Sequence, residues 1–260
     1  VKTVKYLILN GADVHARGDE ALMLASENGH LGVVQFLVTQ GADANRGCGA
    51  LAWASKRGHL DVVKYLVEEG ANIHTNNDKA LGWASGDGHL EVIQFLMDQG
   101  ADVHKNNDEA LRLASYGGHL EVVKYLVGEG ANIHANNDGA LTWASEFGRL
   151  EVVQFLIGVG ADVRADGDKA LRWTSMNGHL GVVKLLIANC ADVHTKDDEA
   201  LRLASKRGHS DVVRYLVENG ANIHAKDDEA LIWASMHGHL ETVKYLILSG
   251  ANIHAGCEKA

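Results

Sequence analysis

The feature that most constrains this chain is a repeat of 30 residues that runs along the whole sequence. An Ala-Leu pair marks each unit, and successive pairs lie 30 residues apart except at the first step, which is 29 residues. The alanines of these pairs are Ala21, Ala50, Ala80, Ala110, Ala140, Ala170, Ala200 and Ala230, and Ala260 opens a further unit. A period of this length predicts a stack of small units that contact only their neighbours, without a separate central core.

Each repeat encodes two short helices. In residues 108–137, Asp108 is a good N-cap for the first helix, and Gly118 ends that helix. Glu121 lies in the first turn of the second helix, which stops at Gly130. We interpret the equivalent aspartates as N-caps too: Asp78, Asp138, Asp168, Asp198 and Asp228. Helices of about 8 to 10 residues are not stable alone in water, so stacking must stabilise them.

Residues 110–134 read Ala-Leu-x-Leu-Ala-Ser-x-x-Gly-His-Leu-Glu-Val-Val-Lys-Tyr-Leu-Val-x-x-Gly-Ala-Asn-Ile-His, and this pattern resembles the ankyrin repeat. The resemblance covers the whole chain and implies an all-α, ankyrin-type helical solenoid of stacked helix-turn-helix repeats. The sequence departs from the family in having no proline and no Thr-Pro-Leu-His opening. Its loop is about three residues shorter than in the 33-residue form, which predicts short connecting turns. The compact form is similar to arrays in proteins of large DNA viruses of amoebae.

We expect one array over residues 1–260, with both ends truncated, because neither end resembles a polar capping repeat. A half repeat would occupy residues 1–20. The eight full repeats would then be 21–49, 50–79, 80–109, 110–139, 140–169, 170–199, 200–229 and 230–259.

The charge and cysteine content limit the partners and the compartment. A formal net charge of -10 argues against nucleic acid or an anionic membrane as the main partner. The pairs Lys56-Arg57 and Lys206-Arg207 are isolated among acidic residues, so only weak, salt-sensitive contact with nucleic acid is expected. Cys48, Cys190 and Cys257 are an odd number at unrelated positions, which favours a reducing compartment, the cytoplasm, in a host cell if the protein is viral.

Fifteen histidines could suggest a metal or catalytic site. Seven precede the second helix, namely His30, His59, His89, His119, His179, His209 and His239, and seven end the loop motif, namely His15, His74, His104, His134, His194, His224 and His254. Equivalent residues on packed helices lie about 8 to 10 Å apart, whereas zinc needs imidazole nitrogens at about 2.0 to 2.1 Å. We therefore favour a structural role, and we expect no metal, no cofactor and no catalytic residue.

A row of tryptophans and leucines occupies one position of the first helix: Leu24, Trp53, Trp83, Leu113, Trp143, Trp173, Leu203 and Trp233. Because leucine replaces tryptophan freely there, packing between repeats is favoured over an exposed binding row.

Three positions of each repeat vary without pattern: one in the first helix and the two before Gly-His. The resemblance places these positions in a concave groove that contacts partners, with neutral drift on a solvated face as the alternative. We select as candidate partner-binding residues Lys56, Arg57, Arg112, Tyr116, Thr142, Glu146, Phe147, Arg172, Met176, Arg202, Lys206, Arg207, Met236 and His237.

These observations predict a non-catalytic scaffold for protein–protein interaction, and the target-recognition arm of a larger adaptor is one form that such a scaffold takes. The residues that recur offer no single asymmetric set of nucleophile, base and orienting group, and no small-molecule substrate is expected. The alternative is the regulatory or substrate-docking arm of an enzyme whose catalytic domain lies outside this sequence.

Overall fold

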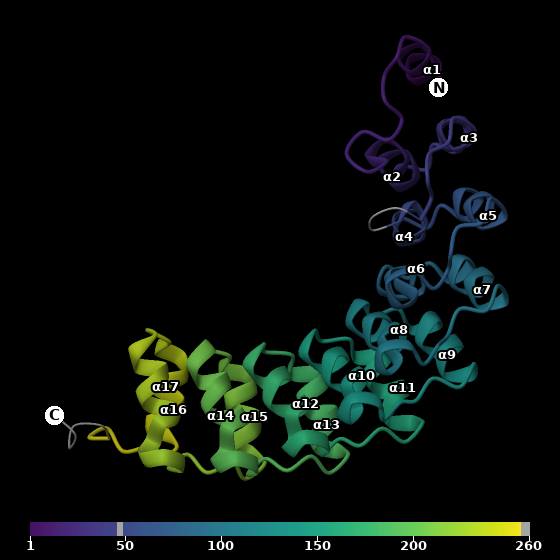
Figure 1. Cartoon of the computed structure of the whole chain (residues 1–260). Helices are drawn as coiled ribbons and strands as arrows, with labels where there is room; N and C mark the ends of the chain where they lie inside the picture. The colour runs from purple at the N-terminus through teal and green to yellow at the C-terminus, as the bar shows by residue number, and fades with distance from the viewer. Residues whose placement is uncertain (46–48, 256–260) are drawn as a thin grey trace. The chain divides into compact units, whose positions relative to one another are not determined.

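A computed structural model describes residues 1–45 and 49–255, and this part of the chain is built from helices and tight turns (Figure 1). Cys48 and Cys257 lie outside the described residues. The helices are α1 Lys2–Leu9, α2 Glu20–Glu27, α3 Leu31–Thr39, α4 Ala50–Lys56, α5 Leu60–Glu68, α6 Thr75–Gly86, α7 Leu90–Asp98, α8 Lys105–Gly117, α9 Leu120–Gly128, α10 Ala135–Glu146, α11 Leu150–Gly158, α12 Ala165–Met176, α13 Leu180–Ala188, α14 Thr195–Arg207, α15 Ser210–Glu218, α16 Ala225–Met236 and α17 Leu240–Leu248. Within the described ranges, none of these helices is long and apolar enough to cross a lipid bilayer.

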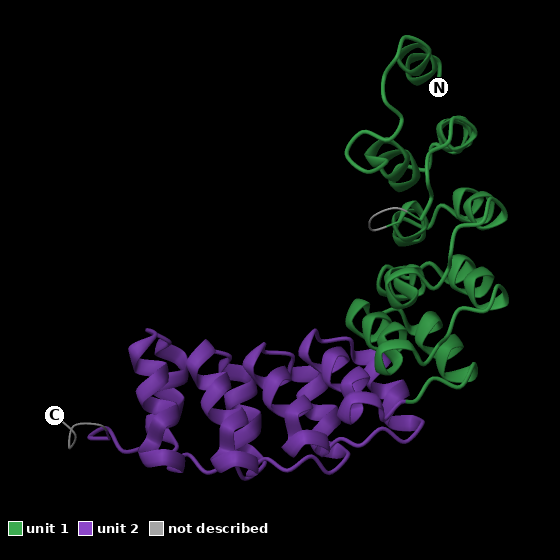
Figure 2. Cartoon of the chain, viewed as in Figure 1, with its two compact units in different colours: residues 1–132 green, residues 133–260 purple. Residues whose placement is uncertain are grey.

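The chain forms two compact units, residues 1–132 and 133–260 (Figure 2). In each unit the first helix of a repeat packs against the second helix of the same repeat and against the first helix of the neighbouring repeat, as α6 does with α7 and α8. The all-α solenoid predicted from the repeat is therefore confirmed. The single array over residues 1–260, with its repeat boundaries, stays a prediction.

The apolar stripes of the sequence form the interior of each unit. Leu111 of the first helix is 1% exposed, and Val123 and Leu126 of the second helix are fully buried. The same positions are buried in the neighbouring repeats, where Leu81 and Leu96 are equivalent to Leu111 and Leu126. Each short helix is thus stabilised by burial of one face against its neighbours.

A left-handed turn connects most repeats. Asn106, Asn107 and Asp108 have φ values of 51°, 56° and 54°. Three consecutive residues in this conformation also occur at 76–78, 136–138, 166–168, 196–198 and 226–228. Asparagine and aspartate visit this region more readily than other residues with a Cβ, which explains the Asn-Asn-Asp sequence. The short connecting turns predicted from the loop length are therefore confirmed.

The aspartate that recurs at the end of this turn bonds it to the next repeat. Oδ1 of Asp198 accepts a hydrogen bond from the backbone N–H of Asn222 at 2.8 Å and lies 3.1 Å from Nδ1 of His194. Equivalent backbone bonds to the next repeat end on Asp19, Asp78, Asp108, Asp138, Asp168 and Asp228. The N-cap prediction is wrong for Asp198, because its carboxylate bonds to the loop instead of to the first turn of its own helix.

The other set of histidines connects the second helix to the preceding repeat. Nε2 of His89 donates to the carbonyl oxygen of Lys56 at 2.9 Å. Equivalent bonds run from His59 to Glu27, His119 to Gly86, His179 to Glu146, His209 to Met176 and His239 to Lys206. The structural role predicted for these histidines is confirmed, and each neutral ring must carry its proton on Nε2 to make this bond.

Candidate partner-binding surface

The candidate residues lie on the first helices and on the turns that follow them, but they differ in exposure. The exposed ones are Arg57, Tyr116, Phe147, Arg207, Met236 and His237, and the half-buried ones are Lys56, Arg112, Glu146, Met176 and Lys206. Thr142, Arg172 and Arg202 are buried, with 5%, 8% and 7% of their surface exposed. The structure thus separates the set into residues that face solvent and residues that belong to the interior.

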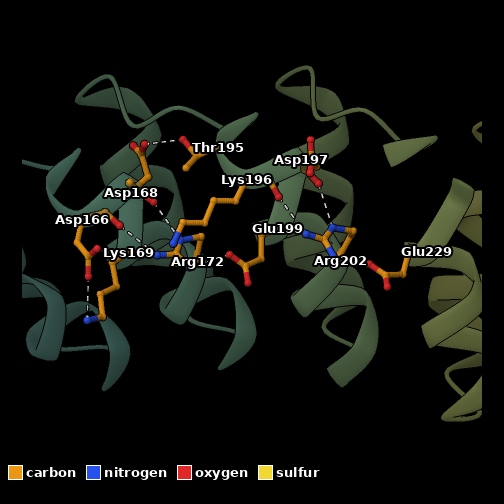
Figure 3. A network of polar contacts seen from close by, with 11 residues as sticks. Asp166, Asp168, Lys169, Arg172, Thr195, Lys196, Asp197, Glu199, Arg202 and Glu229 are labelled. Atoms are coloured by element: carbon orange, nitrogen blue, oxygen red, sulfur yellow. Dashed lines mark hydrogen bonds and ion pairs between the residues drawn. The ribbon is translucent and has the colours of Figure 1, made fainter. Parts of the chain in front are cut away.

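Two arginines of the predicted set are part of the framework of unit 2 (Figure 3). Nε of Arg172 donates to the carbonyl oxygen of Gly167 at 3.0 Å, and Nη2 donates to that of Asp166 at 3.1 Å. Its Nη1 forms an ion pair with Glu199 of the next repeat at 2.7 Å. Arg202 repeats the arrangement one unit further on, with the carbonyls of Asp197 and Lys196 and the carboxylate of Glu229.

This arrangement corrects the interpretation of Arg172 and Arg202 as contact residues. A guanidinium that already bonds two carbonyls and a carboxylate has most of its five N–H donors engaged within the protein. Thr142, which is also buried, has no surface to offer either. We therefore remove these three residues from the candidate contact set.

Arg112 of unit 1 makes the same bonds within its own repeat. Its Nη2 donates to the carbonyl of Asn106 at 3.0 Å, and its Nε lies 3.3 Å from that of Asn107. An arginine four residues after the last left-handed residue therefore closes the turn. The sequence contains this signal as the spacing of Asp108 and Arg112, but the spacing alone does not reveal which atoms meet.

The tryptophans lie between repeats and carry lysines on their faces. The rings of Trp53 and Trp83 meet edge to face with centroids 5.0 Å apart, which is the predicted packing between repeats for this pair. The tryptophans of the row are half-buried, and Leu24 at the same position is 47% exposed. Nζ of Lys56 lies 5.1 Å from each of these two rings, and Nζ of Lys79 lies 4.3 Å from Trp83. Cation–π contacts at these distances fix the lysine side chains along the first-helix face.

A hollow of about 440 Å³ lies between α6 and α8 on the same face of unit 1. Its lining includes Lys79, Gly82, Trp83, Glu109 and Leu113. The sequence analysis did not predict this hollow. Gly82, which has no side chain, lines it at a position where other repeats carry arginine or another side chain.

A family model of ankyrin repeats, built from three copies, matches residues 1–77, 72–137, 134–197 and 171–256. The chain belongs to the ankyrin-repeat family. Ankyrin repeats generally act as protein–protein interaction modules. A search of curated proteins found no match for this chain.

Proposed function

We propose that this ankyrin-repeat protein is a non-catalytic scaffold that binds a protein partner through its first-helix face. This face is defined by the exposed and half-buried candidate residues of the first helices and the turns after them. The observation that carries the proposal is the exposure of large side chains there: Tyr116 is 42% exposed and Phe147 is 40% exposed.

These two aromatic residues occupy variable positions outside the buried stripe. Ala114, two residues before Tyr116, lies on the other side of α8 and is fully buried. Phe147 is the C-cap residue of α10 and follows the buried residues of that helix. Exposed aromatic residues commonly supply much of the energy of protein interfaces, because they bury a large area at a small cost in side-chain entropy.

Charged and flexible residues at the same positions of other repeats suit recognition of another protein. Arg207 is exposed, and Met176 is half-buried with an unbranched side chain that adapts to different shapes. A target-recognition arm of a larger adaptor would use such a surface. In this proposal the repeats provide a rigid support, and the residues that vary from repeat to repeat provide specificity.

The test compares Phe147→Ala with Lys124→Ala, a control in the second helix of unit 1. Lys124 is exposed and forms an ion pair with Glu121, so its loss should leave the first-helix face unchanged. A partner is captured with the wild-type chain, purified, and titrated by calorimetry against each variant. We expect Phe147→Ala to weaken binding at least about tenfold, as loss of an aromatic hot spot does, and Lys124→Ala to have little effect.

Equal affinity of Phe147→Ala and wild type, at unchanged helicity, would contradict the role of this face. Tyr116→Ala tests unit 1 in the same way. The two variants are measured separately, so that each unit is judged by its own aromatic residue.

A further inference from the structure

The hollow at Gly82 is an unfilled version of a site that the chain itself fills elsewhere. Position 82 is equivalent to positions 112, 172 and 202, where the residues are arginines. Arg172 shows what the arginine does: its guanidinium bonds two carbonyls of its own turn and the carboxylate of Glu199 in the next repeat (Figure 3). Repeat 80–109 has glycine in place of this arginine.

The acceptors that surround Arg172 have counterparts around the hollow. The turn at 76–78 has the same left-handed backbone as the turn at 166–168. The carbonyls of Asn76 and Asn77 therefore correspond to those of Asp166 and Gly167. Glu109 corresponds to Glu199, since each lies 27 residues after the position of the arginine.

The hollow keeps capacity to accept hydrogen bonds. Oε2 of Glu109 accepts a hydrogen bond from Nδ2 of Asn106 at 2.8 Å. An ionised carboxylate can accept about four hydrogen bonds and can bind an arginine through both oxygens. A separate narrow space of about 10 Å³ is lined by Asn77 and shares Gly82 and Glu109 with the hollow.

The walls suit the apolar and planar parts of an arginine. Trp83 and Leu113 line the hollow, and both are half-buried. Arg202 lies over the ring of Trp233 in the next repeat, with its guanidinium carbon 5.7 Å from the centroid. The residue at the position of Trp233 beside the hollow is Leu113, so an arginine side chain there meets an apolar leucine instead of a ring.

Among the described residues, Lys79 is the cationic residue that lines the hollow, and Lys105 lines the narrow space that shares Gly82 and Glu109 with it. The equivalent of Lys79 is Lys169, which stands in the same first turn as Arg172. Lys79 itself is held over Trp83 at 4.3 Å. Unit 2 thus combines a lysine at this position with a guanidinium in the site, with Lys169 paired to Asp166 at 3.0 Å. Beside the hollow the residue at the position of Asp166 is Asn76, so Lys79 has its cation–π contact with Trp83 in place of that ion pair.

From these relationships we infer that the hollow binds an arginine side chain of the protein partner. The inference rests on the proposed function and names the chemistry of one partner residue. The guanidinium takes the place that Arg172 occupies in its own repeat, with the carboxylate of Glu109 as its ion-pair partner. A lysine fits this set of acceptors less well, because its single ammonium cannot span two carbonyls and a carboxylate as a planar fork does.

The direct test is an NMR titration of the full chain with the peptide acetyl-Gly-Arg-Gly-amide. We expect amide shifts at Gly82 and Glu109 and a shift of the indole N–H of Trp83. Peptides with lysine or citrulline in place of arginine should bind at least about tenfold more weakly, since they lack the fork or the charge. Equal binding of the citrulline peptide, or shifts confined to other repeats, would overturn the inference.

Substitutions in the hollow provide the second test. Gly82→Arg supplies the missing side chain from within and should abolish binding of the arginine peptide. Gly82→Ala is the matched control, because its Cβ would meet only Cδ1 of Leu113, at 3.4 Å, and would leave most of the hollow open. Glu109→Gln should weaken peptide binding about tenfold or more, because it removes the charge of the ion pair.

Undiminished peptide binding by Gly82→Arg or by Glu109→Gln would also overturn the inference. If Gly82→Arg does not fold, the comparison of Glu109→Gln with Gly82→Ala decides. The peptide titration needs no natural partner, so its failure leaves the function test at Phe147 unaffected. A failure at Phe147 likewise leaves the peptide result intact.

Discussion

The imidazole of His89 packs against Gly58 of the preceding repeat, so closely that a Cβ on this glycine would lie 2.5 Å from Nδ1. The same ring donates from Nε2 to the carbonyl of Lys56, two residues before the glycine. Gly58 also has a φ of 74°, which side chains with a Cβ disfavour. The Gly-His pair of the repeat therefore makes two contacts. The histidine donates a hydrogen bond to the preceding repeat, and the glycine leaves room for the histidine ring of the next repeat.

Gly58→Ala should destabilise unit 1 more than a positive φ alone explains. The backbone cost of a Cβ in this region is about 1 to 2 kcal/mol, and displacement of the His89 ring adds to it. Gly70→Ala is the control, because Gly70 has a φ of 89° but no atom within 4 Å of the added Cβ. The two variants are compared by urea denaturation. Equal losses of unfolding free energy would show that the ring moves aside without cost.

Asp198→Ala should destabilise unit 2 by roughly 1 to 3 kcal/mol. Asp198 is 5% exposed, and its removal leaves the backbone N–H of Asn222 without its acceptor at 2.8 Å. Asp198→Asn keeps an acceptor oxygen in the same place and should cost less. Urea denaturation of both variants measures the difference. An equal loss for the two variants would mean that charge, and not the hydrogen bond to the loop, holds the turn.

Cys190→Gly should stabilise the protein by about 1 to 2 kcal/mol. Cys190 has a φ of 70° at a position where other repeats carry glycine, such as Gly160 and Gly220. Glycine adopts this conformation without the steric cost of a Cβ. Cys190→Ala retains the Cβ and should show no comparable gain. Thermal denaturation under reducing conditions distinguishes the two, and equal melting temperatures would contradict the prediction.

Tyr125 of α9 should make stability fall at alkaline pH. Burial raises the pKa of Tyr125, and the nearby carboxylates of Glu129 and Asp98 raise it further. Because the folded-state pKa is raised, the stabilisation is fully present below the unfolded pKa of about 10 and is lost as pH rises through the folded value. Tyr125→Phe should reduce this alkaline loss. Urea midpoints measured across this range check it, and parallel curves for the two proteins would contradict it.

The repeat, its two helices and its buried stripes follow from the sequence, because each depends on residues a few positions apart. Val122, Val123 and Leu126 lie on one face of any helix written over them, and all three are buried. The left-handed turn was harder to predict. Asn-Asn-Asp before a helix is typical both of an N-cap and of a left-handed segment, since short polar side chains stabilise either.

The candidate surface was predicted less well than the fold. Variability alone cannot separate Phe147, which is exposed, from Arg172, whose partner Glu199 lies 27 residues further along the chain. That pair becomes visible only when one repeat is placed beside the next. The hollow at Gly82 is harder still to predict from the sequence, because a glycine does not reveal an open space. Its interpretation depends on comparison with the arginines at the same position of other repeats.

The histidine and aspartate contacts that recur between repeats make the number of repeats adjustable. Removal of residues 170–199 from unit 2 would bring His209 against Gly148 and the carbonyl of Glu146, the two groups that His179 contacts now. The backbone N–H of Asn222 would meet Asp168 in the same way, in place of Asp192. Loss or gain of one 30-residue block thus regenerates the junction that it interrupts, so the chain can lengthen or shorten by recombination without any new contact having to arise.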